Sequence, residues 1–270
     1  MKIKQSFLTI ASMSFSGIKF LNVIRSYKIT NRLNKILIII LILYSSNGYC
    51  CVNCNKEVQK AISESIYTNI FVMFSAFILL TLTILLLIHF SVKNYNIVSS
   101  QHTNQNKIVS VPLISASMVL GIGIGGFADG IIFHQILQWH EMLSNKFPPN
   151  TLIQKSMNMF WDGIFHLFTL LAAIVGIYLL WRLFKKNNIN TSGYLLTGGM
   201  LAGWGVFNLI EGIINHHILK IHNVRELIPN KDVWNYGFLI FGIFLLIIGW
   251  LIIQKGKKNK NTRVNITKHF

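Results

Sequence analysis

The feature that most constrains this chain is a series of apolar segments, each close to the length needed to cross a bilayer. One runs from about Ile70 to Phe90, and four more follow between residues 111 and 253. About 20 apolar residues span the hydrocarbon core of a membrane. Only 12% of the 270 residues are charged, whereas soluble domains carry about 25%. The pattern predicts an all-α, multi-pass membrane protein whose surroundings are the lipid bilayer.

Polar and proline-containing segments separate the last four apolar runs and predict where each helix ends. The breaks read "SNKFPPNT", "KKNNINTSG" and "RELIPNKD". No strand-like alternation of apolar and polar residues competes with a helical interpretation. The sequence therefore predicts a four-helix transmembrane unit, with helices over about residues 111–142, 157–184, 194–222 and 233–253.

The N-terminal part combines a signal-like segment with one further span. "NRLNKILIIILILYSSNGYC" has a basic start, a short apolar run and small residues before Tyr49, as a secretory signal peptide does. An uncleaved anchor is the equal alternative, and the residues ahead of it are an extension or follow a misplaced start. We expect a basic leader and signal-like segment (1–48), a C-x-x-C segment with one transmembrane helix (49–97), a linker (98–110), the four-helix domain (111–254) and a basic cytoplasmic tail (255–270).

The net charge of +17 lies beside the apolar runs rather than on a separate domain. Basic residues collect before the first run, at Lys185 and Lys186, and again from Lys255 onward. Cytoplasmic loops of membrane proteins carry such an excess of Lys and Arg. The charge therefore predicts topology, with the Lys185 loop and the C-terminus cytoplasmic, and argues against nucleic acid as a partner.

A twelve-residue motif occurs twice, 82 residues apart. "DGIIFHQILQWH" (129–140) and "EGIINHHILKIH" (211–222) agree at seven positions, and an acid begins each. A weaker match at an offset of 73 aligns Trp161 with Trp234 and Phe165 with Phe238. We interpret the four helices as a duplicated helix pair, an internal repeat whose halves run parallel in the membrane.

Acids and histidines gather at one expected depth. Val111 and Asp129 are separated by roughly 27 Å of helix at 1.5 Å per residue, which is nearly the hydrocarbon thickness. Glu211 lies equally far into its helix, and "WDGIFH" places an acid and a histidine in the first turns of the second helix. All of them reach the outward, periplasmic face. The candidate site residues are His134, His140, His166, His216, His222, Asp129, Asp162 and Glu211.

The helical period refines the expected directions of these side chains. At 100° per residue, Asp129 and His140 fall within about 20° of each other, and so do Glu211 and His222. His134 and His216 point roughly 140° away from their acids. Each helix therefore offers ligands in two directions, which suits a site between helices and a second one near the rim.

A carboxylate inside a membrane requires a partner, since it costs about 2.5–3.5 kcal/mol even on insertion scales. No Lys or Arg lies near Asp129, Asp162 or Glu211 in the sequence. Histidines, protons or a bound cation can serve, and imidazole binds zinc, copper, iron and haem alike. We expect a metal or haem site of respiratory metal handling or redox chemistry; an ion- or proton-coupled transporter, a metal-dependent hydrolase and purely structural packing stay open.

Cys51 and Cys54 form a C-x-x-C outside the membrane, with Cys50 beside them. Outside the cytoplasm this spacing fits a disulfide, a redox pair or a metal site. With three cysteines, one is left over in any disulfide pairing. Cys51 and Cys54 therefore make a second candidate metal site.

The chain resembles a bacterial family of predicted membrane proteins, domain of unknown function 2243. The resemblance rests on "GGFADGIIFHQILQWHEMLS", "WDGIFH", "GWGVFNLIEGIINHHILKIHNVRE" and "WNYGFL", over about residues 112–253. In the family Asp usually follows Trp in the last motif, whereas here Asn235 does. The resemblance implies a multi-pass protein of the bacterial inner membrane and an association with assembly factors of haem–copper oxidases, but no activity and no oligomeric state.

Overall fold

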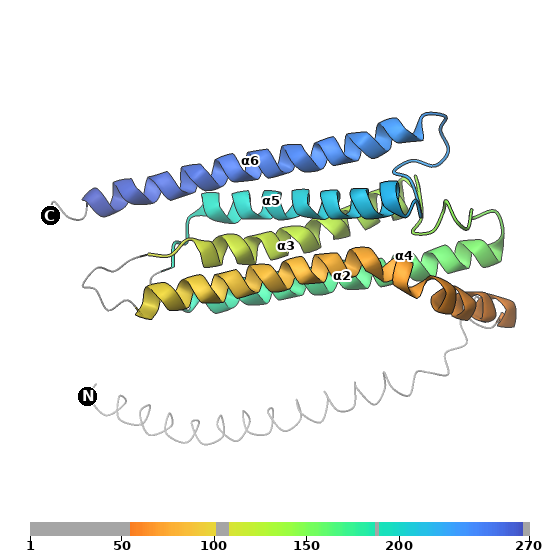
Figure 1. The fold of residues 1–270 in the computed structure, drawn as a ribbon, viewed down its shortest axis with the longest axis horizontal. Coiled ribbons are helices and arrows are strands. Elements are labelled where there is room, and N and C mark those ends of the chain that lie inside the picture. The colour runs from red at the N-terminus through yellow and green to blue at the C-terminus, as the bar shows by residue number, and fades with distance from the viewer. Residues whose placement is uncertain (1–54, 101–107, 187–188, 267–270) are drawn as a thin grey trace, which may run out of the picture. The chain divides into compact units, whose positions relative to one another are not determined.

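A computed structural model describes residues 55–100, 108–186 and 189–266, and helices make up most of them (Figure 1). The described residues contain five long α-helices: α2 (Lys56–Ser100), α3 (Val111–Asp129), α4 (Leu152–Phe184), α5 (Gly193–Glu211) and α6 (Lys231–Ile266). Short π-helical segments extend two of them: η2 (Gly130–Ile136) continues α3 and η3 (Gly212–Ile218) continues α5. The signal-like segment and the candidate pair Cys51 and Cys54 lie outside the described residues.

The predicted fold class is confirmed. Five described segments are long and apolar enough to cross a membrane: Ile70–Ile97, Val111–Ile136, Leu152–Phe184, Gly193–Ile218 and Lys231–Lys258. Many large apolar side chains on α2, α4 and α6 are exposed, among them Phe71, Leu171 and Ile240. In a soluble protein such surfaces would be a liability, whereas in a bilayer they face lipid.

Helices α3 and α5 form the centre of the bundle, with α4 against α3 and α6 against α5. The central pair approaches closely because glycines meet the opposite backbone. A Cβ atom on Gly121 would clash with the backbone of Met200, and one on Gly203 with the backbone of Met118. Small residues at such crossings let membrane helices pack backbone to backbone. This packing brings the C-terminal ends of α3 and α5 side by side.

Helix α2 packs on α3 and α4. Phe77 of α2 stacks on Phe165 and Phe168 of α4, with ring centroids 6.2 and 4.7 Å apart. In the N-terminal parts of the same two helices, the indole N–H of Trp161 donates a hydrogen bond to the hydroxyl of Ser65 at 3.1 Å. The first span therefore belongs to the same packed unit as the four-helix bundle.

The predicted helix ends at residues 142 and 222 are wrong, since the helical segments end at Ile136 and Ile218. The chain reverses at Gln138 and Lys220, both with φ of 48°. The amide of Trp139 donates to the carbonyl of Phe133 at 2.9 Å, and that of Ile221 to Asn215 at 3.0 Å. These bonds close the helix ends around a left-handed residue, a position that usually carries Gly or Asn. The sequence has neither there, so the turn was not foreseen.

Helix α4 begins at Leu152, earlier than the predicted start near residue 157. The hydroxyl of Thr151 accepts from the amide of Gln154, and the side chain of Gln154 accepts from the amide of Thr151. This capping box satisfies two of the amides that a helix start leaves without partners. Thr151 and Gln154 were therefore a usable sequence signal for the helix start.

Candidate metal centre

Seven of the eight candidate membrane-site residues are buried together where α3 and α5 end and where α4 and α6 begin. Their side chains come from the last residues of α3 and α5, from η2 and η3, from the segments after η2 and η3, and from the first half of α4. The residues range from 0% to 5% exposed: Asp129, His134, His140, Asp162, Glu211, His216 and His222. The predicted common depth therefore corresponds to one shared location in the fold.

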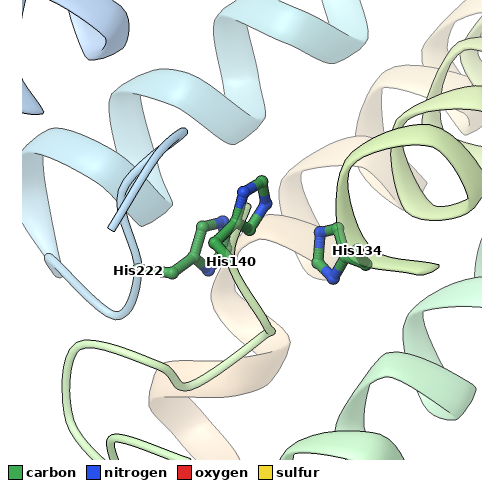
Figure 2. A group of neighbouring side chains, drawn as sticks. All are labelled: His134, His140 and His222. Atoms are coloured by element: carbon green, nitrogen blue, oxygen red, sulfur yellow. The ribbon is translucent and has the colours of Figure 1, made fainter. Parts of the chain in front are cut away.

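His140 and His222 form the middle of the cluster and are held by reciprocal hydrogen bonds. The Nδ1 atom of His140 lies 2.9 Å from the carbonyl oxygen of Val224, and Nδ1 of His222 lies 3.0 Å from that of Met142. The two rings stack, with centroids 4.7 Å apart and planes 8° from parallel (Figure 2). A carbonyl oxygen only accepts, so Nδ1 carries the proton in both rings. In a neutral ring Nε2 then presents a lone pair.

His134 lies between two carboxylates of the first half of the cluster. Its Nδ1 is 2.8 Å from Oδ1 of Asp162, and its Nε2 is 3.5 Å from Oδ2 of Asp129. The Asp162 oxygen also accepts the amide of Met142 at 2.8 Å. Asp162 therefore fixes the His134 ring and the backbone that holds His222. With Nδ1 donating to Asp162, Nε2 of His134 is the atom left to bind a cation.

In the second half of the cluster, Glu211 occupies the position that corresponds to Asp129 in the repeat. Its Oε1 atom lies 2.9 Å from Nε2 of His222, 3.1 Å from Nε2 of His216 and 3.4 Å from Nδ2 of Asn215. The His216 contact lacks hydrogen-bond geometry, and neither ring nitrogen of His216 has a hydrogen-bond partner. Oε2 of Glu211 has none either. Buried polar atoms are rarely left without a hydrogen-bond partner.

Two sequence differences between the halves account for two of the buried atoms without a hydrogen-bond partner. Asp129 is one methylene shorter than Glu211, and Nε2 of His140 has no hydrogen-bond partner where Nε2 of His222 meets Glu211. Asp162 receives Nδ1 of His134, whereas Asn235 accepts the amide of Val224 and donates to Asn223, at 3.0 and 2.9 Å. Nδ1 of His216 is left without a partner. The cluster therefore contains potential metal ligands that have no hydrogen-bond partner among the described residues.

The three buried carboxylates have no basic side chain beside them in the described residues. Every ion pair of Asp129, Asp162 and Glu211 there is to a histidine. The lysines at this end pair elsewhere, Lys155 with Glu141 and Lys231 with Glu226. Three negative charges are therefore buried without a fixed positive partner, which is costly in a low-dielectric interior.

The donors form two overlapping sets, each able to hold a metal ion. One contains His134, His140 and His222, and the other contains Glu211, His216 and His222, with ligand atoms within 4.8 Å of one another in each. Atoms bound to one ion at about 2.0–2.1 Å lie no more than about 4.2 Å apart. Ligand atoms at the 4.8 Å limit must therefore approach each other by at least about 0.6 Å for coordination.

The interlocking loops after η2 and η3 seal this end of the cluster. The amide of Asn145 donates to the carbonyl of Ile221 and that of Glu226 to Trp139, both at 3.0 Å. Arg225 lies over the rings of Trp139 and Trp234, 5.0 and 5.3 Å from their centroids.

Burial lowers the pKa of His140 well below its ordinary value, and the neighbouring histidines lower it further. A neutral His140, with its Nε2 lone pair available, is the form that binds metals.

The eighth predicted residue, His166, does not join either donor set. It is half-buried, its Nδ1 lies 2.6 Å from the carbonyl of Asp162, and its ring packs edge-on against Phe127. The helical-wheel prediction for His140 and His222 is also wrong, because both follow the reversal at Gln138 or Lys220 and not a continuing helix. They reach the cluster from loops instead.

Sequence reasoning missed Asn215 and the carbonyls of Met142 and Val224. Asn215 is 1% exposed and follows Glu211 by four residues, the helical spacing that places two side chains on one face. An amide in an otherwise apolar stretch was therefore a usable signal. The carbonyl partners carry no signal of their own, since any residue supplies a carbonyl.

Comparison with known proteins gives a family but no described relative. The model of a family described as predicted membrane protein, DUF2243, matches residues 116–256. The match covers the four-helix bundle and includes every residue of the buried cluster. No curated protein and no solved structure matches the chain.

Proposed function

This chain belongs to the DUF2243 family of predicted membrane proteins, and we propose that it holds a transition-metal ion in the buried histidine cluster. The carrying observation is the contact between His222 and Glu211. His222 has its proton on Nδ1, so its Nε2 lone pair faces a carboxylate oxygen at 2.9 Å. Two lone pairs at this distance repel unless a cation or a proton lies between them.

Protons alone neutralise this cluster poorly. Compensating three carboxylates with imidazolium ions requires three charged rings among four, and any such choice includes an adjacent pair. Adjacent ring centroids lie 4.3, 4.7 and 4.8 Å apart. Two unit charges at 4.8 Å repel by about 3.5 kcal/mol at an effective dielectric constant of about 20. A divalent metal ion compensates two of the three carboxylate charges while the imidazoles stay neutral.

Imidazole and carboxylate donors suit zinc, iron or copper. We favour a bare ion over haem because His140 and His222 stack face to face and are fixed by carbonyls, leaving no gap for a macrocycle. Asp162 is well placed to orient His134, as carboxylates commonly orient metal-bound histidines. We favour a role in metal handling or redox chemistry over hydrolysis because the donors are at most 5% exposed.

The halves of the cluster support an origin by duplication of a helix pair. The π-helical segments η2 and η3 begin 82 residues apart, and so do the left-handed residues Gln138 and Lys220. His140 donates to the carbonyl of Val224, two residues after His222, and His222 donates to the carbonyl of Met142, two residues after His140. Met142 and Val224 donate their amides to Asp162 and Asn235, which the offset of 73 relates. We place the cluster at the outward face, opposite the basic ends of the bundle.

Ion relay by the same residues is the second candidate. Asn208 lies one helical turn before Glu211, is 1% exposed, and its side-chain oxygen has no hydrogen-bond partner. A polar group of this kind in a membrane helix marks ion pathways. Metal-dependent proton flux in proteoliposomes, abolished in Asn208→Ala, would favour relay over a resident centre.

The deciding experiment is elemental analysis and an optical spectrum of the protein purified in detergent. Wild-type protein should carry stoichiometric zinc, iron or copper without a haem band. The double variant His134→Ala, His222→Ala should lose it, because both residues belong to one donor set. Variant His217→Ala is the matched control: His217 lies beside His216 on η3 but outside both donor sets, against Tyr236. Wild-type protein that binds no metal, even after incubation with each ion, would refute the proposal.

A further inference from the structure

We propose that the cluster is a dinuclear centre that binds two divalent cations, one in each half. The inference rests on the proposed function and deepens it. The first cation is held by His134 and His140, with Asp129 beside His134, and the second by Glu211, His216 and His222. Asp162 orients the first set, and Asn215 lies beside the second.

The donor geometry provides two places for an ion, because neither donor set contains all four histidines. His134 and His216 never share a donor set, although each shares one with His222. His222 offers only Nε2, since its Nδ1 donates to the carbonyl of Met142. A neutral imidazole with one free nitrogen binds one ion. His222 therefore belongs to one ion at a time, and a second ion needs its own donors.

Unpartnered atoms show where the second ion binds. In the half around Glu211, the buried atoms without a hydrogen-bond partner are Oε2 of Glu211, Oδ1 of Asn215 and both nitrogens of His216. These residues are 1–3% exposed. Leaving such atoms buried and unpaired costs about 1–3 kcal/mol each. A cation bound by Glu211 and by one nitrogen of His216 removes part of this cost.

In the other half of the cluster, His140, His134 and the nearby Asp129 carboxylate indicate where the first ion binds. Nε2 of His140 has no hydrogen-bond partner. The rings of His140 and His134 are 4.3 Å apart, and Nε2 of His134 lies 3.5 Å from Oδ2 of Asp129. A distance of 3.5 Å between donors is what two ligands of one ion at about 2.1 Å show. One ion here uses both Nε2 atoms, and the Asp129 oxygen lies beside that of His134.

Charge does not distinguish one ion from two. Three carboxylates with one divalent cation leave a net charge of −1, and with two divalent cations a net charge of +1. The buried ligand atoms that have no hydrogen-bond partner favour two ions over one. Protein two-metal sites place their ions about 3.5–4 Å apart, a spacing compatible with stacked central rings whose centroids lie 4.7 Å apart.

The test counts metal ions per chain in purified full-length protein. Metal-free protein is titrated with Co²⁺, whose absorption in the visible range reports bound ions, and the stoichiometry is checked by elemental analysis after dialysis. Wild-type protein should bind two Co²⁺ in two steps. His216→Ala should bind one, His134→Ala should bind one, and the control His217→Ala should bind two.

Each outcome bears on one of the two proposals. Saturation of wild-type protein at one Co²⁺ overturns the dinuclear centre and leaves the metal-binding function standing. No binding overturns both. Two ions in wild-type and in His216→Ala overturn the assignment of the second site.

If His216→Ala does not fold, Mn²⁺ loading of wild-type protein gives an independent answer. Two ions in adjacent sites should give an exchange-coupled electron paramagnetic resonance spectrum, and an isolated six-line Mn²⁺ signal at saturation would refute the inference. Glu211→Gln, which keeps the side-chain shape, should reduce affinity for the second Co²⁺ at least tenfold and leave the first step in place.

Discussion

At the scale of residues, Asp162 is the side chain on which most of the first half-cluster depends. One oxygen, Oδ1, accepts from Nδ1 of His134 and from the amide of Met142, both at 2.8 Å. The carbonyl of Met142 in turn holds His222. A single carboxylate therefore sets the tautomer of one histidine and the position of another. Asn235, the corresponding residue of the other half, keeps the backbone contact but not the histidine contact.

We predict that Asp162→Asn weakens metal binding by about 10–100-fold, the usual effect of losing a carboxylate that orients a metal-bound histidine. The amide can still accept the Met142 N–H, so folding should be largely kept. Competition with a chromophoric chelator measures the affinity. Asp232→Asn, at an exposed position in the first turn of α6, is the control. Unchanged affinity in Asp162→Asn would contradict the proposed role.

At the scale of elements, the crossing of α3 and α5 decides whether the two halves meet. Gly121 and Gly203 each lie against the backbone of the opposite helix, at Met200 and Met118. The ends of these helices carry η2 and η3, so the separation of the histidines follows from the crossing. The reversals at Gln138 and Lys220 then direct His140 and His222 back toward the bundle.

Gly203→Ala should separate α3 from α5 and lower the unfolding midpoint in detergent. Overpacking of this kind costs about 1–3 kcal/mol. Metal binding should weaken in parallel because the halves move apart. Gly237→Ala is the matched control, since no atom lies within 4 Å of an added Cβ there, and Ala is the better helix former. Equal unfolding midpoints for the two variants would show that the close crossing is not required.

At the scale of the whole molecule, one group of basic side chains lies at the end of the bundle opposite the buried cluster, whereas Lys155 and Lys231 at the cluster end pair with acids. Lys185 lies over the ring of Trp181, Lys186 over Tyr95 and Lys255 over Tyr194, at 3.4, 3.9 and 5.1 Å from the centroids. Aromatic and basic residues together are typical of a membrane interface. The bundle is therefore asymmetric along its axis, with one basic end and one end that carries the cluster.

The asymmetry predicts that the C-terminus is cytoplasmic and the histidine cluster faces outward, because Lys-rich and Arg-rich loops stay on the cytoplasmic side. A green fluorescent protein fused after residue 270 should fluoresce, and alkaline phosphatase fused there should be inactive. Phosphatase inserted in the loop after Pro148 should be active. Active phosphatase at the C-terminus would reverse the assignment.

Hydropathy and spacing in the sequence were sufficient to predict the five spans of the described residues, the gathering of acids and histidines at one end, and the family. These properties follow from hydropathy and helical rise, which depend on residues close together in the chain. The residues that could be nominated this way are Asp129, His134, His140, Asp162, Glu211, His216 and His222, and the start of α4 could be predicted from Thr151 and Gln154.

Only the tertiary structure decided which atoms meet. His140 reaches a carbonyl 84 residues away and His222 one 80 residues away, and a backbone carbonyl leaves no trace in residue identity. The reversals escaped prediction because Gln138 and Lys220 adopt a left-handed conformation that usually selects Gly or Asn. His166 has the right residue type and depth, yet its ring turns to Phe127. Composition and period place a histidine on a helix, but packing against neighbouring helices sets where its nitrogens point.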